Sequence, residues 1–239
     1  MLHSGGKVVK NAAGFLMHQA LVGSCGTLAV LAELTFKVFP AAEAHATVRI
    51  RRSDLAAALS LITTLQRTRL DLEALDLEPP STVVLRLGGF REALAGRIDA
   101  VRATIDSPID VWLDDDDARI WSEARELAWA SASDALVRVP VTPAVIGRFD
   151  ADIARLDAAR RYTIGANLAW VSAPFSAVPA LHDILKAAGL TGQVIRGPRG
   201  PAFIGVTGSN AVEARLRQVL DPDGRFLPAP PVATFAATE

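Results

Sequence analysis

The sequence predicts an α+β fold in which strands and helices alternate and the sheet is largely antiparallel. Two observations carry this prediction. Residues 47–113 alternate between strand and helix periodicity in the order β-α-β-β-α-β, which is the ferredoxin-like arrangement. Residues 5–40, in contrast, form a glycine-dense stretch, GGKVVKNAAGFLMHQALVGSCGTLAVLAELTFKVFP. We therefore expect two domains, at residues 1–42 and 43–239.

The glycine-dense stretch predicts a strand, a short helix and a turn in succession. Residues 7–10 form a β-like run, Asn11 can cap a helix, and the apolar residues 12–22 stop at a glycine. Gly23 and Gly26 allow positive φ and would let a ligand lie against bare backbone amides.

From Leu28 onward the same stretch predicts a strand. Leu34, Phe36 and Val38 alternate with polar residues, and Pro40 ends the pattern. We expect residues 41–46 to form a hinge to the second domain.

The second domain is expected to hold two helices among its first four strands. The strands are predicted at residues 47–52, 70–77, 82–87 and 109–113, and the helices at residues 55–65 and 94–105. Further strands are predicted at residues 137–139, 162–164, 168–171, 193–196 and 203–206, and further helices near residues 120–127, 143–156, 176–188 and 212–219. No internal repeat is evident in the sequence.

Composition narrows the class of protein. The chain has 239 residues, half of them hydrophobic, and a formal net charge of −1, which offers no electrostatic footprint for nucleic acid. The single cysteine, Cys25, excludes an internal disulfide and fits a reducing compartment, so we expect a cytoplasmic protein. No apolar run is long enough to span a bilayer, so membrane association would come only through partners.

Residue types that commonly carry catalysis are sparse. The four histidines, expected to serve on the surface or in local hydrogen bonds, are His3, His18, His45 and His182. Cys25 has no cationic neighbour and reads as a packed residue, and its surroundings lack the spacing of a nucleophile elbow. The four aspartates at residues 114–117 suit the solvated start of a helix better than a metal site. The catalytic residues remain unknown, and no metal site is predicted.

Two motifs in the first domain resemble a known family. VVKNAAGF at residues 8–15 and LVGSCGTLAVLAELTFKVFP at residues 21–40 resemble the second half of the flavin-binding domain, of the PCMH type, in FAD-linked oxidases of the vanillyl-alcohol oxidase type. They look closest to the FAD-binding subunits of bacterial glycolate oxidases. The resemblance is weaker afterwards and ends in LDPDGRFLP at residues 220–228. Leu16 and Ala29 depart from the family pattern, as do Leu227, Ala229 and Pro230.

The resemblance implies an FAD-dependent oxidoreductase subunit that oxidises a small 2-hydroxy acid such as glycolate, with a cap domain after the flavin-type remnant. It implies partners in a complex, including an FAD-containing subunit and an iron–sulfur subunit. The implied FAD-binding residues are Lys10, Asn11, Gly14, Gly23, Ser24, Gly26, Thr27, Leu28, Val30 and Glu33. In the family, the half-domain with the pyrophosphate loop precedes this point, so we expect the chain alone to bind FAD poorly. The alternative is a non-catalytic assembly subunit that has lost FAD binding.

Overall fold

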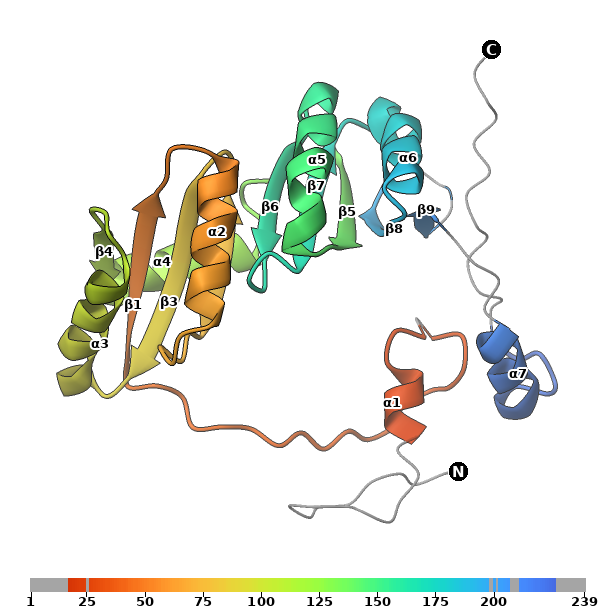
Figure 1. Cartoon of the computed structure of the whole chain (residues 1–239). Coiled ribbons are helices and arrows are strands. Elements are labelled where there is room, and N and C mark those ends of the chain that lie inside the picture. The colour runs from red at the N-terminus through yellow and green to blue at the C-terminus, as the bar shows by residue number, and fades with distance from the viewer. Residues whose placement is uncertain (1–16, 25, 198–199, 201, 207–210, 227–239) are drawn as a thin grey trace. The chain divides into compact units, whose positions relative to one another are not determined.

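The computed structural model describes residues 17–24, 26–197, 200, 202–206 and 211–226 (Figure 1). The described residues divide into two compact units. The larger unit lies within residues 41–207, and the smaller unit combines residues 17–40 with residues 211–226. The strand expected at residues 7–10 and the Asn11 helix cap lie outside the described residues.

The larger unit is built on one antiparallel sheet of nine strands within the described residues. Their spatial order is β4-β1-β3-β2-β6-β7-β5-β8-β9. The strands are β1 (Ala44–Arg51), β2 (Ala74–Glu78), β3 (Thr82–Gly89), β4 (Asp110–Leu113), β5 (Ala135–Pro140), β6 (Ala159–Thr163), β7 (Leu168–Ala173), β8 (Thr191–Arg196) and β9 (Phe203–Gly205). The mixed α+β class with a largely antiparallel sheet is thus confirmed.

Five α-helices and two short 3₁₀ turns connect these strands. They are α2 (Leu55–Gln66), α3 (Arg91–Thr104), α4 (Asp114–Arg125), α5 (Pro143–Ile153), η1 (Ala154–Leu156), η2 (Phe175–Ala177) and α6 (Val178–Ala187). The α2 helix begins where the Asp54 carboxylate accepts a hydrogen bond from the Ala57 amide at 2.8 Å, and α5 begins at Pro143, a favoured first helical residue.

The first half of the larger unit has the order that periodicity predicts. Its elements follow as β1-α2-β2-β3-α3-β4, and its strands lie side by side as β4-β1-β3-β2. Leu94, Ile98 and Val101 share the buried face of α3, as the helical spacing predicts. This half is ferredoxin-like in topology.

The second half repeats the topology of the first. Its elements follow as β5-α5-β6-β7-α6-β8, and its strands lie side by side as β8-β5-β7-β6, with β9 added at the edge. The repetition is one of topology and not of residues, so the sequence, in which no internal repeat is evident, does not indicate it. The two halves meet where Leu77 of β2 pairs with Tyr162 of β6, and the Gly165 amide donates to the Leu75 carbonyl at 2.7 Å.

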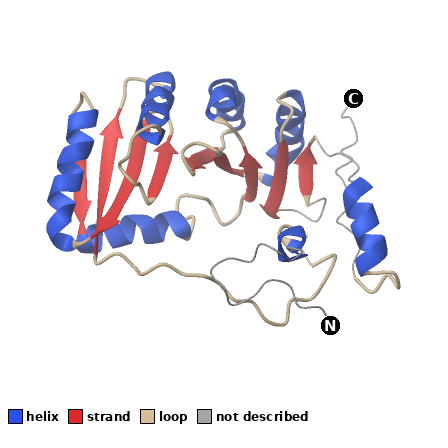
Figure 2. Ribbon diagram, turned by 60° about the horizontal axis from the view of Figure 1, so that its bottom comes forward, coloured by secondary structure: helices blue, strands red, loops and turns tan. Residues whose placement is uncertain are grey.

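The sheet has one face covered by helices and one face that is polar. The buried sides of α2, α3, α5 and α6 join a single apolar core with the inward residues of the strands. Figure 2 shows α4 on the opposite side of the sheet from α2, α5 and α6. The α4 helix covers only part of its face, and the polar face is where the charged and tryptophan side chains of the strands collect.

The prediction of a strand after Leu28 is wrong. Residues 29–42 have no strand or helix, although the alternation of apolar and polar side chains is present. A strand needs a neighbour for its backbone hydrogen bonds, and no other described segment pairs with these residues.

Two boundaries also differ from expectation. The hinge is shorter, because Ala44 and Ala46 already pair with Gly89 and Leu87 in the sheet. The strand expected from residue 70 begins only at Ala74, because Asp71 adopts a left-handed φ of +51° that interrupts an extended chain.

The smaller unit contains two described helices, α1 (Met17–Leu21) and α7 (Ala211–Leu220). The α1 helix lies within the helix expected at residues 12–22, of which the structure describes residues 17–22. The α7 helix confirms the last predicted helix. After α7, the Asp221 carboxylate accepts hydrogen bonds from the amides of Arg225 at 2.7 Å and Phe226 at 2.9 Å. These bonds lower the pKa of Asp221. The LDPDGRF segment is therefore a turn closed by Asp221, and Arg217 of α7 donates to its Phe226 carbonyl at 2.9 Å.

Candidate functional site

The flavin-like motif contributes a tight turn after α1. Gly23 and Gly26 have φ of +83° and +78°, the left-handed values expected from the sequence. Among the described residues, no atom beyond the chain neighbours would lie within 4 Å of a Cβ placed on either glycine. Within the described residues, the turn therefore has room beside its glycine Cα atoms, which suits the close approach of a flat ligand.

Other residues predicted to bind the cofactor stabilise the turn itself. The amide and the hydroxyl of Thr27 both donate to the Ser24 carbonyl, at 2.9 and 2.7 Å, and the Ser24 amide donates to the Leu21 carbonyl at 3.1 Å. Thr27 and Leu28 are buried. The amides of Ser24 and Thr27 are thus already used as donors, and a ligand at this turn would have to find other partners.

The remaining predicted residues fall into two groups. Val30 and Glu33 are exposed and follow the turn in the extended segment. Lys10, Asn11 and Gly14 lie outside the described residues.

The extended segment exposes large apolar side chains. The side chains of Phe36, Val38 and Phe39 are 76%, 80% and 82% exposed. Leu31 and Leu34 are about half exposed. Neighbouring exposed apolar side chains of this kind are characteristic of surfaces that take part in association.

The described part of the motif fits an FAD only in part. The open glycine backbone suits a flat ring or a pyrophosphate lying against it. Charge for the phosphates is scarce, since His18 and Lys37 are the basic residues that the structure describes between residues 17 and 40. The Lys37 ammonium lies 5.8 Å from the centre of the Phe39 ring. A complete FAD site would need cationic or amide donors from elsewhere.

On the polar face of the sheet, Asp117 organises a buried network. Its carboxylate accepts two donors of Arg86, with Nη2 at 2.6 Å from Oδ2, and the Thr47 hydroxyl at 2.6 Å. The Trp121 indole donates to the Thr47 hydroxyl at 2.8 Å. The expectation that residues 114–117 are all solvated is therefore wrong for Asp117, whose side chain is 2% exposed. The helix turns this fourth aspartate towards the sheet, while the other three face solvent.

A second ion cluster joins the two halves of the sheet. Arg161 of β6 donates through Nε to Asp76 at 3.0 Å and through Nη1 to Glu78 at 2.7 Å, both on β2. Its Nη2 lies 3.0 Å from Asp76 but is buried and makes no hydrogen bond within the described structure. Burial raises the pKa of the Asp76 carboxyl, although the Arg161 charge opposes the shift. Glu78 also lies 3.7 Å from Arg49, whose guanidinium covers the Trp112 ring at 5.1 Å.

A cleft of about 270 Å³ lies on this polar face, between the end of α4 and the sheet. The sheet contributes Asp76, Arg161, Thr163 and Trp170, and α4 with the turn after it contributes Trp121, Ala124, Arg125 and Leu127. The α4 helix ends at Arg125, and Leu127 has a left-handed φ of +56° that turns the chain away. The result is a recess with two indole side chains and two arginines.

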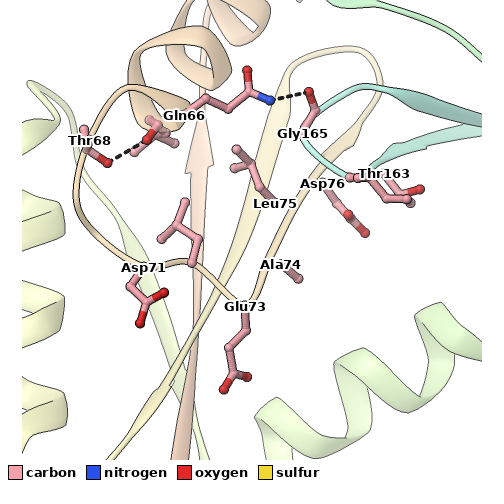
Figure 3. A pocket seen from close by; sticks show the side chains of 12 residues that line it. Gln66, Thr68, Asp71, Glu73, Ala74, Leu75, Asp76, Thr163 and Gly165 are labelled. Atoms are coloured by element: carbon pink, nitrogen blue, oxygen red, sulfur yellow. Dashed lines mark hydrogen bonds between the residues drawn. The ribbon is translucent and has the colours of Figure 1, made fainter. Parts of the chain in front are cut away.

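A larger pocket of about 420 Å³ lies at the junction of the two halves (Figure 3). At one end Gln66 of α2 donates to the Gly165 carbonyl at 3.0 Å. Figure 3 shows the carboxyl groups of Asp71 and Glu73 pointing away from that of Asp76, so the three acids do not converge on one point. Among the residues that the structure describes, no group of three metal-binding side chains is found.

The described histidines have local partners. His45 lies in β1 and not in a hinge, with Nε2 at 3.2 Å from Glu73 Oε2. His182 Nδ1 accepts the Gly205 amide at 3.0 Å. These contacts agree with the local hydrogen-bonding role expected from the sequence.

Comparisons with known proteins add no assignment. No protein-family model matches the chain, and no curated protein matches it. Within the described residues, no helix is long and apolar enough to cross a membrane.

Sequence reasoning missed the polar face as a candidate site. Arg86 interrupts the apolar strand β3, and Arg161 lies in the middle of β6, each at a position where alternation sends the side chain away from the core. Asp76 does the same in β2. Charged residues in the middle of strands were the sequence signal for this polar face. Which of these charges form ion pairs, however, depends on which strands are neighbours in the sheet.

Proposed function

We propose that the chain is the FAD-binding subunit, of the glycolate oxidase type, of an oxidoreductase that acts on a small 2-hydroxy acid, and that it is incomplete without other subunits. The proposal rests on the likeness of residues 8–15 and 21–40 to FAD-linked oxidases. The observation that supports it best is the turn at Gly23 and Gly26, whose left-handed backbone without side chains would let a flat ligand approach closely inside the flavin-like motif.

The larger unit would serve as the substrate or cap domain. Oxidation of a 2-hydroxy acid requires a group to hold the carboxylate, for which arginine is the usual choice, and a base for the hydroxyl proton. The polar face of the sheet offers several arginines, and the flavin would supply the hydride acceptor.

The need for other subunits is inferred from the few donors that the described part of the motif offers. With the Ser24 and Thr27 amides engaged in the turn, the part of the motif within residues 17–24 and 26–40 supplies few donors for a pyrophosphate. Three missing charge-assisted hydrogen bonds, at about 1.5–3 kcal/mol each, would weaken binding by several orders of magnitude. We therefore expect the purified chain to be colourless and inactive towards glycolate and lactate.

A fluorescence titration tests the assignment to flavin. Protein is added to a fixed low concentration of FAD and the anisotropy of flavin fluorescence is followed to several hundred micromolar protein. We expect weak binding that Gly26→Val abolishes. The matched control is Gly224→Val, because Gly224 has φ of +64° and equally open surroundings but lies outside the motif.

The results of the FAD titration distinguish the possible roles of the chain. Tight stoichiometric binding by the chain alone would show that it needs no partner for FAD. No change in anisotropy at the highest protein concentration, or equal loss in the Gly26 and Gly224 variants, would contradict the flavin assignment.

A non-catalytic assembly subunit is the second candidate, favoured by the apolar side chains exposed at residues 30–39. In that case the chain would associate with itself or with partners through this segment without binding FAD. Sedimentation of the wild type and of Phe36→Ser at micromolar concentration tests this reading. A monomeric wild type would count against self-association, and an unchanged oligomer in the variant would count against the segment.

A further inference from the structure

We propose that the cleft between the end of α4 and the sheet binds a carboxylate that carries a single aromatic ring. The site lies wholly within the larger unit and uses none of the flavin-like motif. It therefore stands independently of the proposed function, and FAD titration does not test it.

Two tryptophans give the cleft its aromatic character. Trp121 is held in place by its hydrogen bond to the Thr47 hydroxyl, with the Arg86 guanidinium 5.9 Å from the centre of its ring. Trp170 of β7 lies in register with Arg161 on one neighbouring strand and Arg138 on the other. Both indoles are only partly buried, so apolar ring surface remains accessible. Such surface favours stacking with another planar ring.

The charges around the cleft favour an anion. Arg125 is exposed at the rim, and its contact with Glu126, at 3.7 Å, is a weak pair between two largely exposed side chains. Arg161 also lines the cleft, with its guanidinium held by Asp76 and Glu78 and its Nη2 3.0 Å from Asp76 Oδ2. Asp76 is the one acid among the lining residues, and it is already engaged by Arg161.

The size of the cleft limits the ligand to one ring. Its volume of about 270 Å³ is below the range of roughly 300–1,000 Å³ that holds drug-sized molecules. A ring can lie against the indoles, with its carboxylate directed to Arg125 at the rim. A cation would meet the Arg125 charge at the rim and would find Asp76, the one lining acid, already paired with Arg161.

An NMR titration of the full chain tests the proposal. The probe is benzoate, followed through the indole N–H signals of the four tryptophans. Cyclohexanecarboxylate has the same charge without a planar ring, and benzyl alcohol has the ring without the charge. We expect benzoate to bind with Kd on the order of 1 mM. The signals of Trp121 and Trp170 should shift most, and both analogues should bind more weakly.

Variants locate the binding energy. Arg125→Gln should weaken benzoate binding about two- to fivefold, as for a partly exposed charge, and Trp170→Leu about tenfold through lost stacking. The matched control is Arg148→Gln, because Arg148 is likewise exposed but lies on α5. Arg125 is on the surface, so its variant should fold even if the Trp170 variant does not.

Several results would overturn the proposal. One is the absence of shifts at the Trp121 and Trp170 signals with benzoate at 20-fold above the expected Kd (about 20 mM). Another is that cyclohexanecarboxylate binds as tightly as benzoate. A third is that Arg125→Gln binds benzoate with the affinity of the wild type. Preferential loss in Arg125→Gln over Arg148→Gln, together with the expected order of probes, would establish the site.

Discussion

Replacing Asp117 by alanine should destabilise the larger unit strongly, because it removes the partner of a shielded arginine. Asp117 has a side chain 2% exposed and accepts hydrogen bonds from Arg86 and Thr47, and the Arg86 side chain is 24% exposed. Breaking a buried ion pair by deleting one partner costs about 3–5 kcal/mol. Because Arg86 keeps some access to water, we expect a loss of about 3 kcal/mol, towards the lower end of that range.

The measurement is urea unfolding followed by circular dichroism, with thermal unfolding beside it. A loss of about 3 kcal/mol corresponds to a fall in Tm of about 6–12 °C for a unit of this size. The matched control is Asp116→Ala in the same helical turn, since Asp116 is 63% exposed and its pair with Arg119 is at the surface. That variant should change the unfolding free energy by less than about 0.5 kcal/mol.

Both aspartates lie in the first turn of α4, so any interaction with the helix dipole is similar in the two variants. The excess loss in Asp117→Ala therefore measures the buried network. Equal losses in the two variants would refute the reasoning, because the contacts to Arg86 and Thr47 would then carry no more than a surface pair.

Two further predictions concern the core. Tyr162 donates to Asp150 at 2.8 Å, and burial raises its pKa, so the folded state holds the phenol proton more tightly than the unfolded chain. The resulting stability is present below about pH 10 and is lost as pH rises above it. Tyr162→Phe should lower the free energy of unfolding by about 1 kcal/mol at pH 7. If urea unfolding gave the same free-energy difference between wild type and variant at pH 11, this reasoning would be contradicted. Gly205→Ala should cost more than about 2 kcal/mol, because φ is +86° and the new Cβ would meet a backbone oxygen. Gly147→Ala, in open space on α5, should instead stabilise by about 0.5–1 kcal/mol, and a loss comparable to that of the Gly205 variant would argue against the steric explanation.

Local pattern alone determined most elements of the larger unit. The spacing of Leu94, Ile98 and Val101 predicted the buried face of α3, and Thr142 followed by Pro143 predicted the start of α5. Such signals are readable because residues three or four apart on a helix, or two apart on a strand, share a face whatever the rest of the chain does. The positive φ of Gly23 and Gly26 is likewise a local property.

Tertiary structure decided which patterns became structure and which side chains met. Residues 28–38 alternate like a strand, yet none forms, because strand hydrogen bonds need a neighbour that the described chain does not provide. Four consecutive aspartates look alike in the sequence, but only the helix packed on the sheet directs Asp117 to Arg86.

The candidate site on the polar face depends on the same distinction. Arg161 meets Asp76 across 85 residues only because the second strands of the two halves are paired at Leu77 and Tyr162. No local spacing records that pairing, since the halves share topology without an evident sequence repeat. The sequence by itself thus determined the elements and the buried faces, whereas long-range strand pairing decided the duplication, the ion clusters and the aromatic cleft.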